Sequence, residues 1–365
     1  MTRPLEDYAL LGDGRTAALV SRDGSIDWLC WPRFDGDACF AALLGGPENG
    51  CWTLSPADTV ISHSRRYRDD TLIVETDFEV SGGVARVIDF MPVGGEPSSL
   101  VRIVVGLSGV VKMHSQLRLR FDYGALVPLA VSTGDTVHAR VGQHQVVLRA
   151  EVHLMQKADC VQVAFEVVSG SRVRFVMTHG EADAPLPETP DAERALVDTQ
   201  HYWQDWIARF DNRRTAWPAM ARRSLLTLHA LTFHSSGAII AAPTTSLPEA
   251  RAGQLNWDYR YCWLRDTSFA VVALLNAGFH DEARAWRDWL LRAIAGSAEH
   301  IRVMYRVDGS RHLPEWTADW LDGYRYARPV RIGNAAAAQR QIDVLGEVLD
   351  SLDIARRAGL PVETK

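Results

Sequence analysis

The chain of 365 residues is long enough for about two domains of ordinary size. Its composition, 47% hydrophobic and 23% charged, is typical of globular proteins, and its formal net charge is −6. No long run of positive charge is present, which argues against a nucleic-acid-binding surface. No apolar stretch approaches the roughly 20 residues that a membrane span needs. We therefore expect neither nucleic acid nor a membrane among its partners.

Five cysteines stand at scattered spacings, and no CxxC pair indicates a zinc site. The N-terminus lacks the apolar core of a secretory signal, so we expect reduced, mostly buried thiols in a cytoplasmic protein. No metal or cofactor is expected. The 12 tryptophans can serve either as core filling or as flat platforms for sugar rings. Oligomeric state is not indicated by the sequence.

From about residue 5 to 200, short alternating segments are separated by turns. The dipeptide Asp23-Gly24 is a strong hairpin signal, and residues 72–90 form two alternating segments around a Gly-Gly turn. Many short strands with regular turns are typical of a β-sandwich. We therefore predict an antiparallel β-sandwich domain over residues 1–182.

A proline-rich stretch near residue 183 ends this pattern, and a helical segment follows at about 191–210. We predict a linker with one helix over residues 183–216. Apolar residues then recur at helical spacing, which predicts a helical domain over residues 217–365. One helix is expected directly after Trp217-Pro218, and three more are expected over residues 259–277, 281–295 and 335–358.

The apolar faces of these four helices need partners to be buried. Trp286 and Trp289 lie on one face of the helix over residues 281–295, and an apolar stripe runs from Ile342 to Ala355 in the last helix. With only four helices, we expect both surfaces to lack enough other apolar surface to pack against. A large exposed apolar patch is an aggregation liability, which suggests that helices are missing.

Aromatic and charged residues alternate in the segment Asn-Trp-Asp-Tyr-Arg-Tyr-Cys-Trp-Leu-Arg-Asp, residues 256–266. It follows an apolar run that ends in the polar loop Thr-Thr-Ser-Leu-Pro-Glu, residues 244–249. Sugar recognition uses this mixture, because aromatic faces stack on a pyranose while carboxylates and guanidinium groups hold its hydroxyls. The same residues could instead form an aromatic core helix around Arg265 and Asp266, and the residues alone leave both interpretations open.

A second group of candidates lies in the long connection before the last helix, since such loops are usually functional or mobile. We interpret Glu315 and Arg331 as candidate binding residues. Asp319 and Asp322 are more simply explained as solvated loop charges. Asn334 is expected to cap the N-terminus of the helix that follows.

Several blocks of the sequence resemble the bacterial branch of glycoside hydrolase family 15, which holds glucoamylase-like enzymes and α,α-trehalases. Two blocks resemble its signatures, and three resemble its trehalase-like N-terminal β-domain. The signature-like blocks are residues 256–266 and Pro-Val-Arg-Ile-Gly-Asn-Ala-Ala at 329–336, with Gln339 and Asp343. The N-terminal blocks are Glu-Asp-Tyr-Ala-Leu-Leu-Gly at 6–12, Asp-Gly-Ser-Ile-Asp-Trp at 23–28 and Pro-Arg-Phe-Asp at 32–35.

The resemblance implies an α+β multidomain protein, with an N-terminal antiparallel β-sandwich followed by an (α/α)6 barrel. About four of the twelve barrel helices are expected in this chain. The implied ligand is an α-glucoside such as trehalose or a malto-oligosaccharide, bound through its non-reducing glucose. The implied substrate-binding residues are Tyr259, Trp263, Arg265, Asp266, Glu315 and Arg331.

The family hydrolyses terminal α-glucosidic bonds and releases glucose with inversion. One glutamic acid protonates the glycosidic oxygen, and a second glutamate activates water from about 6.5–9.5 Å away. In the family both glutamates follow the Pro-Val-Arg-Ile-Gly-Asn block, whereas this chain ends at Lys365 before either. We therefore expect a truncated chain that contains no catalytic residue and is inactive alone.

Two alternatives remain open. The chain could be a non-catalytic sugar-binding or interaction module, or Asp266 and Glu315 could act as acid and base within it. The sequence does not choose between trehalose and maltose-type or isomaltose-type substrates.

Overall fold

Two units make up the protein in the computed structural model, which describes residues 3–360. The first ends at Gln204 and the second begins at Asp205, close to the end of helix α1 (Ala192–Ala208). No helix among the described residues combines the length and the apolar character that crossing a membrane requires. All five cysteine side chains are buried.

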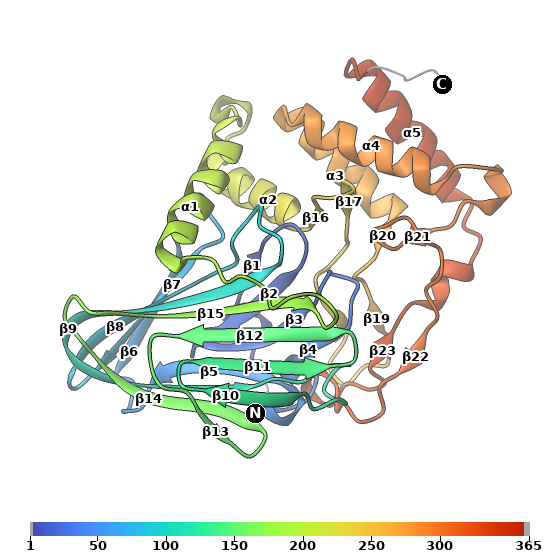
Figure 1. Ribbon diagram of the computed structural model, residues 1–365. Coiled ribbons are helices and arrows are strands. Elements are labelled where there is room, and N and C mark those ends of the chain that lie inside the picture. The colour runs from blue at the N-terminus through green and yellow to red at the C-terminus, as the bar shows by residue number, and fades with distance from the viewer. Residues whose placement is uncertain (1–2, 361–365) are drawn as a thin grey trace. The chain divides into compact units, whose positions relative to one another are not determined.

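In the described part of the first unit there are 15 strands, and every pair of neighbours is antiparallel (Figure 1). This confirms the prediction of an N-terminal antiparallel sheet domain. The strands are β1 (Tyr8–Gly12), β2 (Ala17–Ser21), β3 (Ser25–Cys30), β4 (Ala38–Phe40), β5 (Cys51–Pro56), β6 (Ser62–Tyr67), β7 (Val74–Val80), β8 (Gly83–Phe90), β9 (Ser99–Arg118), β10 (Leu129–Thr133), β11 (Thr136–Val141), β12 (His144–Ala150), β13 (Met155–Lys157), β14 (Cys160–Val168) and β15 (Arg172–Glu181).

The long strand β9 joins two sheets. Its C-terminal half pairs with β5 and β14, in the sheet that continues to β3, β2 and β1. Its N-terminal half pairs with β8 and β15, in the sheet that contains β6, β7 and the series β12, β11, β10. Gly109 marks the change of partners: its φ is +63°, and a Cβ there would lie 2.1 Å from the carbonyl oxygen of Gly82. Only glycine fits this point of the strand.

Both sheets bury side chains in one hydrophobic core. Leu11, Trp52 and Leu117 come from the first sheet, and Val87 and Phe175 come from the second. All of them are at most 3% exposed. The alternation of apolar and polar residues along the strands thus places one face of each sheet in a shared interior.

The predicted hairpin at Asp23-Gly24 is confirmed, since β2 and β3 flank it. Gly24 has a φ of +82°, and its carbonyl oxygen accepts a hydrogen bond from the guanidinium of Arg102 on β9 (2.7 Å). Arg102 is itself fully buried and forms an ion pair with Asp89 on β8 (2.7 Å). The turn is therefore fixed to the core by a charge-assisted hydrogen bond.

The N-terminal part of α1 covers the outer face of the second sheet. Ala195 and Leu196 pack on a second apolar cluster that includes Ile88 and Val176. Glu193 forms ion pairs with two arginines of β15 at 2.7 Å each, which adds a polar edge to this contact.

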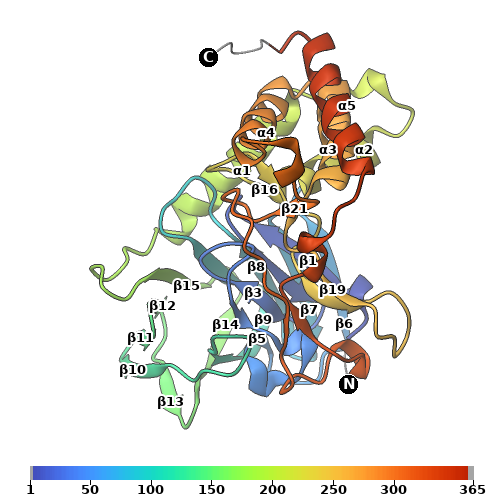
Figure 2. The ribbon, with the colours of Figure 1, turned by 90° about the vertical axis from the view of Figure 1, so that its right-hand side faces the viewer.

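Within the described residues the second unit contains four α-helices and four short two-stranded ribbons (Figure 1, Figure 2). Helix α3 packs against α4 and α5. The helices are α2 (Pro218–Ala230), α3 (Leu264–Ala277), α4 (His280–Ala293) and α5 (Asp343–Arg357). The ribbon strands are β16 (Thr232–Phe233), β17 (Ala238–Ile239), β18 (Thr245–Pro248), β19 (Asn256–Asp258), β20 (Cys262–Trp263), β21 (Met304–Tyr305), β22 (Trp316–Thr317) and β23 (Arg331–Ile332).

Two predicted helices start later than the sequence pattern suggests. The helix expected over residues 259–277 begins at Leu264, because the carboxylate of Asp258 accepts hydrogen bonds from the backbone and guanidinium of Arg260 and holds this stretch extended. The helix expected from residue 335 begins at Asp343. Residues 335–338 form a 3-10 turn that Asn334 caps through a bond from the Ala336 N–H (3.0 Å), so the predicted cap is confirmed on a shorter element.

The prediction that Trp286 and Trp289 lack partners is wrong, since they are only 1% and 2% exposed. The long connection after α4 supplies Tyr305, whose ring meets that of Trp289 edge-on at 6.1 Å. In α5 the buried residues are Val344, Val348, Ser351 and Ala355, of which only Ala355 belongs to the predicted stripe. From that stripe Ile342 and Leu349 are 80% and 68% exposed.

Candidate functional site

Five of the six candidate binding residues line one cavity of about 450 Å³ in the second unit. They come from three separate stretches of the chain: residues 257–265, 315 and 331–341. Asp266 is not among the lining residues. The cavity is lined by Trp257, Tyr259, Trp263, Arg265, Glu315, Arg331, Asn334, Ala335, Ala336, Gln339 and Gln341.

Two short ribbons bring these stretches together. Strand β22 pairs with β23 so that Thr317 lies opposite Arg331, and β23 also contacts β18 and β19. Glu315 therefore lies close to Gly333, which follows β23. Gly333 has a φ of +78°, and a Cβ there would lie 1.8 Å from the carbonyl oxygen of Pro314. This approach of the two backbones requires glycine.

Arg331 is held from several sides and its side chain is 18% exposed. Its guanidinium lies over the ring of Trp257, 4.4 Å from the ring centroid, and donates to the carbonyl oxygen of Gln254 at 2.7 Å. Its Nε is 3.5 Å from Oε1 of Glu315. The buried hydroxyl of Ser246 accepts a hydrogen bond from the Arg331 N–H at 2.7 Å. The Thr-Thr-Ser loop thus positions Arg331 through its backbone.

Glu315 uses both carboxylate oxygens. Oε2 accepts a hydrogen bond from the N–H of Ala335 at 3.0 Å, while Oε1 faces Arg331. Its side chain is 23% exposed, so the carboxylate remains open to the cavity. A carboxylate held in this way can accept hydrogen bonds from ligand hydroxyls in a fixed direction.

A buried ion pair beneath the cavity connects the two signature-like blocks. Asp258 and Arg260 are both fully buried, and their closest contact is 2.7 Å from Nη2 to Oδ2. The same Oδ2 accepts a hydrogen bond from the N–H of Gly333 at 3.0 Å, and Asn334 donates to the carbonyl oxygen of Asp258 at 3.0 Å. Asp258 and Arg260 therefore fix the backbone that carries Arg331.

At the other end of the cavity, Arg265 forms an ion pair with Asp343 at 2.6 Å and donates to Gln341 at 3.3 Å. These contacts tie the first turn of α3 to the start of α5. Asp266 follows Arg265 in that turn with its side chain exposed. The negative charge of Asp266 nevertheless acts on Tyr259, as one of the causes that raise its pKa.

Tyr259 and Trp263 form an aromatic wall, with ring centroids 5.9 Å apart and an interplanar angle of 47°. Burial is the first cause of the raised pKa of Tyr259, followed by the charge of Glu249, to which the tyrosine hydroxyl donates at 3.4 Å. The hydroxyl therefore stays protonated at neutral pH, and its proton is directed to Glu249.

Sequence reasoning missed several features of the site. Trp257 lies inside the aromatic run, and its place beside Arg331 depends on pairing with a segment over 70 residues away. The Asp258–Arg260 pair has a local signal, because residues i and i+2 of an extended segment share a face. Gln341 lines the cavity only because the last helix starts later than predicted.

Three aromatic rings, two guanidinium groups and a carboxylate around a cavity of this size suit a small polyhydroxylated ligand. Among the described lining residues Glu315 is the single carboxylate. Inverting hydrolysis needs two carboxyl groups across the scissile bond. The alternative that pairs Asp266 with Glu315 therefore finds no support, since Asp266 lies outside the lining.

A cavity lined by aromatic rings, guanidinium groups and a carboxylate is typical of sugar-binding sites. A sequence model described as glycosyl hydrolases family 15 matches residues 218–365, and one described as trehalase-like, N-terminal matches residues 1–203. The chain belongs to glycoside hydrolase family 15, in the trehalase- and glucoamylase-like group that carries this N-terminal domain.

Curated relatives agree with this assignment. The chain is 33% identical to a trehalase of Mycolicibacterium smegmatis over 96% of its own length and 56% of the relative. It is 33% identical to a trehalase of Mycobacterium tuberculosis (95% and 55%) and 32% identical to trehalase 1 of Sulfolobus acidocaldarius (95% and 59%). The chain thus spans less than two thirds of the length of these relatives.

A solved structure shows a similar fold. A bacterial glucoamylase crystallised with acarbose superposes with a TM-score of 0.61 over 85% of this chain and 53% of that one, at 14% sequence identity. At this identity the similarity concerns the fold alone.

Proposed function

We propose that this chain forms the glucose-binding part of a glycoside hydrolase that releases glucose from the non-reducing end of α-glucosides such as trehalose or malto-oligosaccharides, with inversion. The observation that carries the proposal is the convergence of five candidate residues, from three stretches of the sequence, on one cavity. The family assignment and the trehalase relatives support the substrate class.

In this proposal the aromatic rings of Trp257, Tyr259 and Trp263 stack on the sugar ring. Arg265 and Glu315 hold its hydroxyls, because guanidinium and carboxylate groups make strong, directional hydrogen bonds. Asp266, which is exposed in the first turn of α3 and lies outside the lining, contributes to binding through its charge, which also acts on Tyr259.

Arg331 keeps Glu315 and Trp257 in place, being in contact with both. We also propose the division into residues 1–182, 183–216 and 217–365, with the cavity in the last segment as part of an (α/α)6 barrel.

Both catalytic carboxyl groups are proposed to lie outside residues 1–365. The cavity offers a single carboxylate among its described lining residues, and Glu315 already faces Arg331 and the N–H of Ala335. One carboxylate cannot both protonate the glycosidic oxygen and activate water on the opposite face. The chain alone is therefore expected to bind glucosides without cutting them.

Isothermal titration calorimetry with trehalose, maltose and glucose tests this proposal. We expect binding of at least one sugar, and a loss of about tenfold or more in affinity for Trp263→Ala and for Arg265→Ala. Trp320→Ala is the matched control, because Trp320 is 45% exposed and does not line the cavity. The absence of heat with all three sugars would remove the proposal.

A non-catalytic sugar-binding module is the second candidate, and the same single carboxylate favours it. The two candidates differ in whether the α-glucoside is hydrolysed at all. A glucose-release assay on a longer protein that contains this chain separates them, since only a hydrolase forms β-glucose from an α-glucoside. Glucose release by the 365-residue chain itself, abolished in Asp266→Ala, would contradict the proposed absence of catalytic groups.

A further inference from the structure

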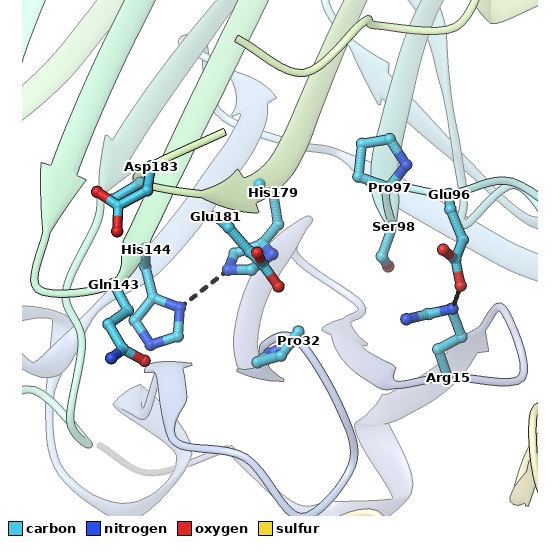
Figure 3. A pocket seen from close by; sticks show the side chains of 12 residues that line it. Arg15, Pro32, Glu96, Pro97, Ser98, Gln143, His144, His179, Glu181 and Asp183 are labelled. Carbon is cyan, nitrogen blue, oxygen red and sulfur yellow. Dashed lines mark hydrogen bonds and ion pairs between the residues drawn. The ribbon is translucent and has the colours of Figure 1, made fainter. Parts of the chain in front are cut away.

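The first unit contains a polar cavity and an apolar cavity, and the proposed glucoside binding uses neither. The polar cavity, of about 630 Å³, lies where the β11–β12 turn meets the end of β15 (Figure 3). Its polar groups pair with one another: Nδ1 of His144 lies 3.0 Å from Nε2 of His179, and Arg15 forms an ion pair with Glu96. The apolar cavity, of about 180 Å³, is lined from both sheets.

Aliphatic side chains make up most of the wall of the apolar cavity. Leu117 and Val161 come from the first sheet, and Val137 and Leu148 come from the second. Each of these four is at most 7% exposed. The cavity is lined by Leu117, Leu119, Val127, Pro128, Ala130, Val137, Ala139, Val146, Leu148, Gln156, Ala158, Asp159, Cys160 and Val161.

Two small residues explain why this space is left between the sheets. Ala130 on β10 and Ala139 on β11 are direct cross-strand partners, and both line the cavity. Side chains directly opposite each other share a face of the sheet, so two methyl groups stand where longer side chains would fill the interior. Protein interiors leave few gaps larger than a water molecule. The alanine pair thus creates an exception to the usual packing of a sandwich.

The chemistry of the wall selects an apolar ligand. A buried water needs about two to four polar partners. Among the described lining residues the only buried polar side-chain group is the thiol of Cys160, which already contacts the carbonyl oxygen of Lys157 at 3.3 Å and the amide of Gln116 at 3.4 Å. A sugar would leave its hydroxyls without hydrogen bonds here, which is costly. The cavity therefore suits another class of ligand than the glucoside cavity does.

The volume of the cavity limits the ligand to a single ring. An apolar protein cavity of about 150 Å³ binds benzene or xenon. At about 180 Å³ the cavity between the sheets is slightly larger, so it has room for one six-membered hydrocarbon ring with a small substituent. A fatty acyl chain would be too long for it.

Exposed residues form the entrance of the cavity. Val127 is 59% exposed, and Gln156 and Asp159 also reach solvent. Ala158, in the turn between β13 and β14, has a φ of +53°, in the region that favours glycine. A glycine would relieve this strain but would remove a methyl group from the cavity wall. Backbone strain of this kind clusters at ligand-binding sites.

We propose that the apolar cavity binds a small monocyclic aromatic compound, with its ring between the two sheets and any polar substituent at the entrance, near Gln156 and Asp159. The driving force is the transfer of the ring out of water, together with the dispersion contacts that it makes with the aliphatic wall. Because such a ligand binds only the folded chain, it should stabilise the fold more strongly at higher ligand concentration.

Saturation-transfer-difference NMR with toluene tests the proposal, with the melting temperature as a second readout. We expect transfer from the chain to the aromatic protons of toluene, and a melting temperature that rises with toluene concentration. Ala139→Leu should weaken toluene binding by about tenfold or more, because the added carbon atoms occupy the space of the ring. Ala130→Val is a smaller change in the same wall. It should also weaken binding, and it keeps the test open if Ala139→Leu does not fold.

Val131→Leu is the matched control, since Val131 lies on β10, is 55% exposed and is not among the described lining residues. Its toluene binding should equal that of the original chain. Trp263→Ala shows whether toluene enters the glucoside cavity instead, because Trp263 lines that cavity. The absence of transfer to toluene, equal binding by Ala139→Leu, Ala130→Val and Val131→Leu, or a loss of binding confined to Trp263→Ala would overturn the proposal.

Discussion

The ion pair between Asp258 and Arg260 provides the sharpest prediction for the candidate site. Both side chains are fully buried, and Asp258 also accepts the N–H of Gly333. Asp258→Asn leaves the guanidinium of Arg260 buried without its counter-charge, and breaking a buried pair on one side costs about 3–5 kcal/mol. The whole fold is stabilised by only about 5–15 kcal/mol, so the loss is large.

Urea denaturation followed by far-UV circular dichroism measures this loss as a fall in the transition midpoint. Hydrogen exchange of a peptide that covers residues 329–336 locates it, because Asp258→Asn turns one of the two oxygens that accept from Arg260 and Gly333 into an NH2 group, which cannot accept. Asp322→Asn is the control: Asp322 pairs with Arg328 on the surface, both are 56% exposed, and such pairs contribute about 0–1 kcal/mol.

Arg260→Met in the Asp258→Asn background also removes the buried positive charge of the guanidinium. The double variant should regain part of the stability, because replacing both members of a buried pair is often close to neutral. A loss below about 1 kcal/mol for Asp258→Asn, equal to that of the surface control, would refute this account of the pair.

Three further predictions concern packing and pH. Gly333→Ala should lower the melting temperature and cost at least about 1–3 kcal/mol, because its φ of +78° and the 1.8 Å approach to Pro314 exclude a Cβ; an unchanged melting temperature would contradict this. Trp286→Ala should cost about 3–5 kcal/mol in urea denaturation, as it is 1% exposed, whereas Leu349→Ala, 68% exposed, should cost less than about 0.5 kcal/mol. Burial, followed by the charges of His234 and Arg209, holds the pKa of His229 well below its ordinary value. The unfolded chain therefore takes up a proton below about pH 6.5 that the folded chain does not, and stability should fall with decreasing pH by up to about 1.4 kcal/mol per unit. His229→Gln should flatten this slope, and an unchanged slope would show that other groups cause it.

Turn, strand and capping signals in the sequence predict the structure correctly where the conformational preference of the residues themselves decides it. The hairpin at Asp23-Gly24, the antiparallel strands and the capping role of Asn334 all follow from such preferences. The helix boundaries at Leu264 and Asp343 did not follow. Before Leu264 the side-chain hydrogen bonds that Asp258 accepts from Arg260 compete with helical periodicity, and before Asp343 residues 335–338 form a separate 3-10 turn capped by Asn334.

The candidate site could be predicted only as a set of residues. The sequence pointed to Arg265, Glu315 and Arg331, and the structure brings them to one cavity, but their binding of a sugar stays a prediction. The burial of Trp286 could not be foreseen, because Tyr305 and the long connection that cover α4 carry no helical pattern. The histidine pair was also missed, since its members are 35 residues apart on paired strands.

A crystal structure of the chain grown with trehalose tests the central claim most directly. We predict a glucose ring in the cavity, stacked on Trp263 and hydrogen-bonded to Arg265 and Glu315, with the glycosidic bond uncut. An empty cavity at a saturating sugar concentration, or a sugar bound only elsewhere on the chain, would contradict the assignment of this cavity as the glucose site.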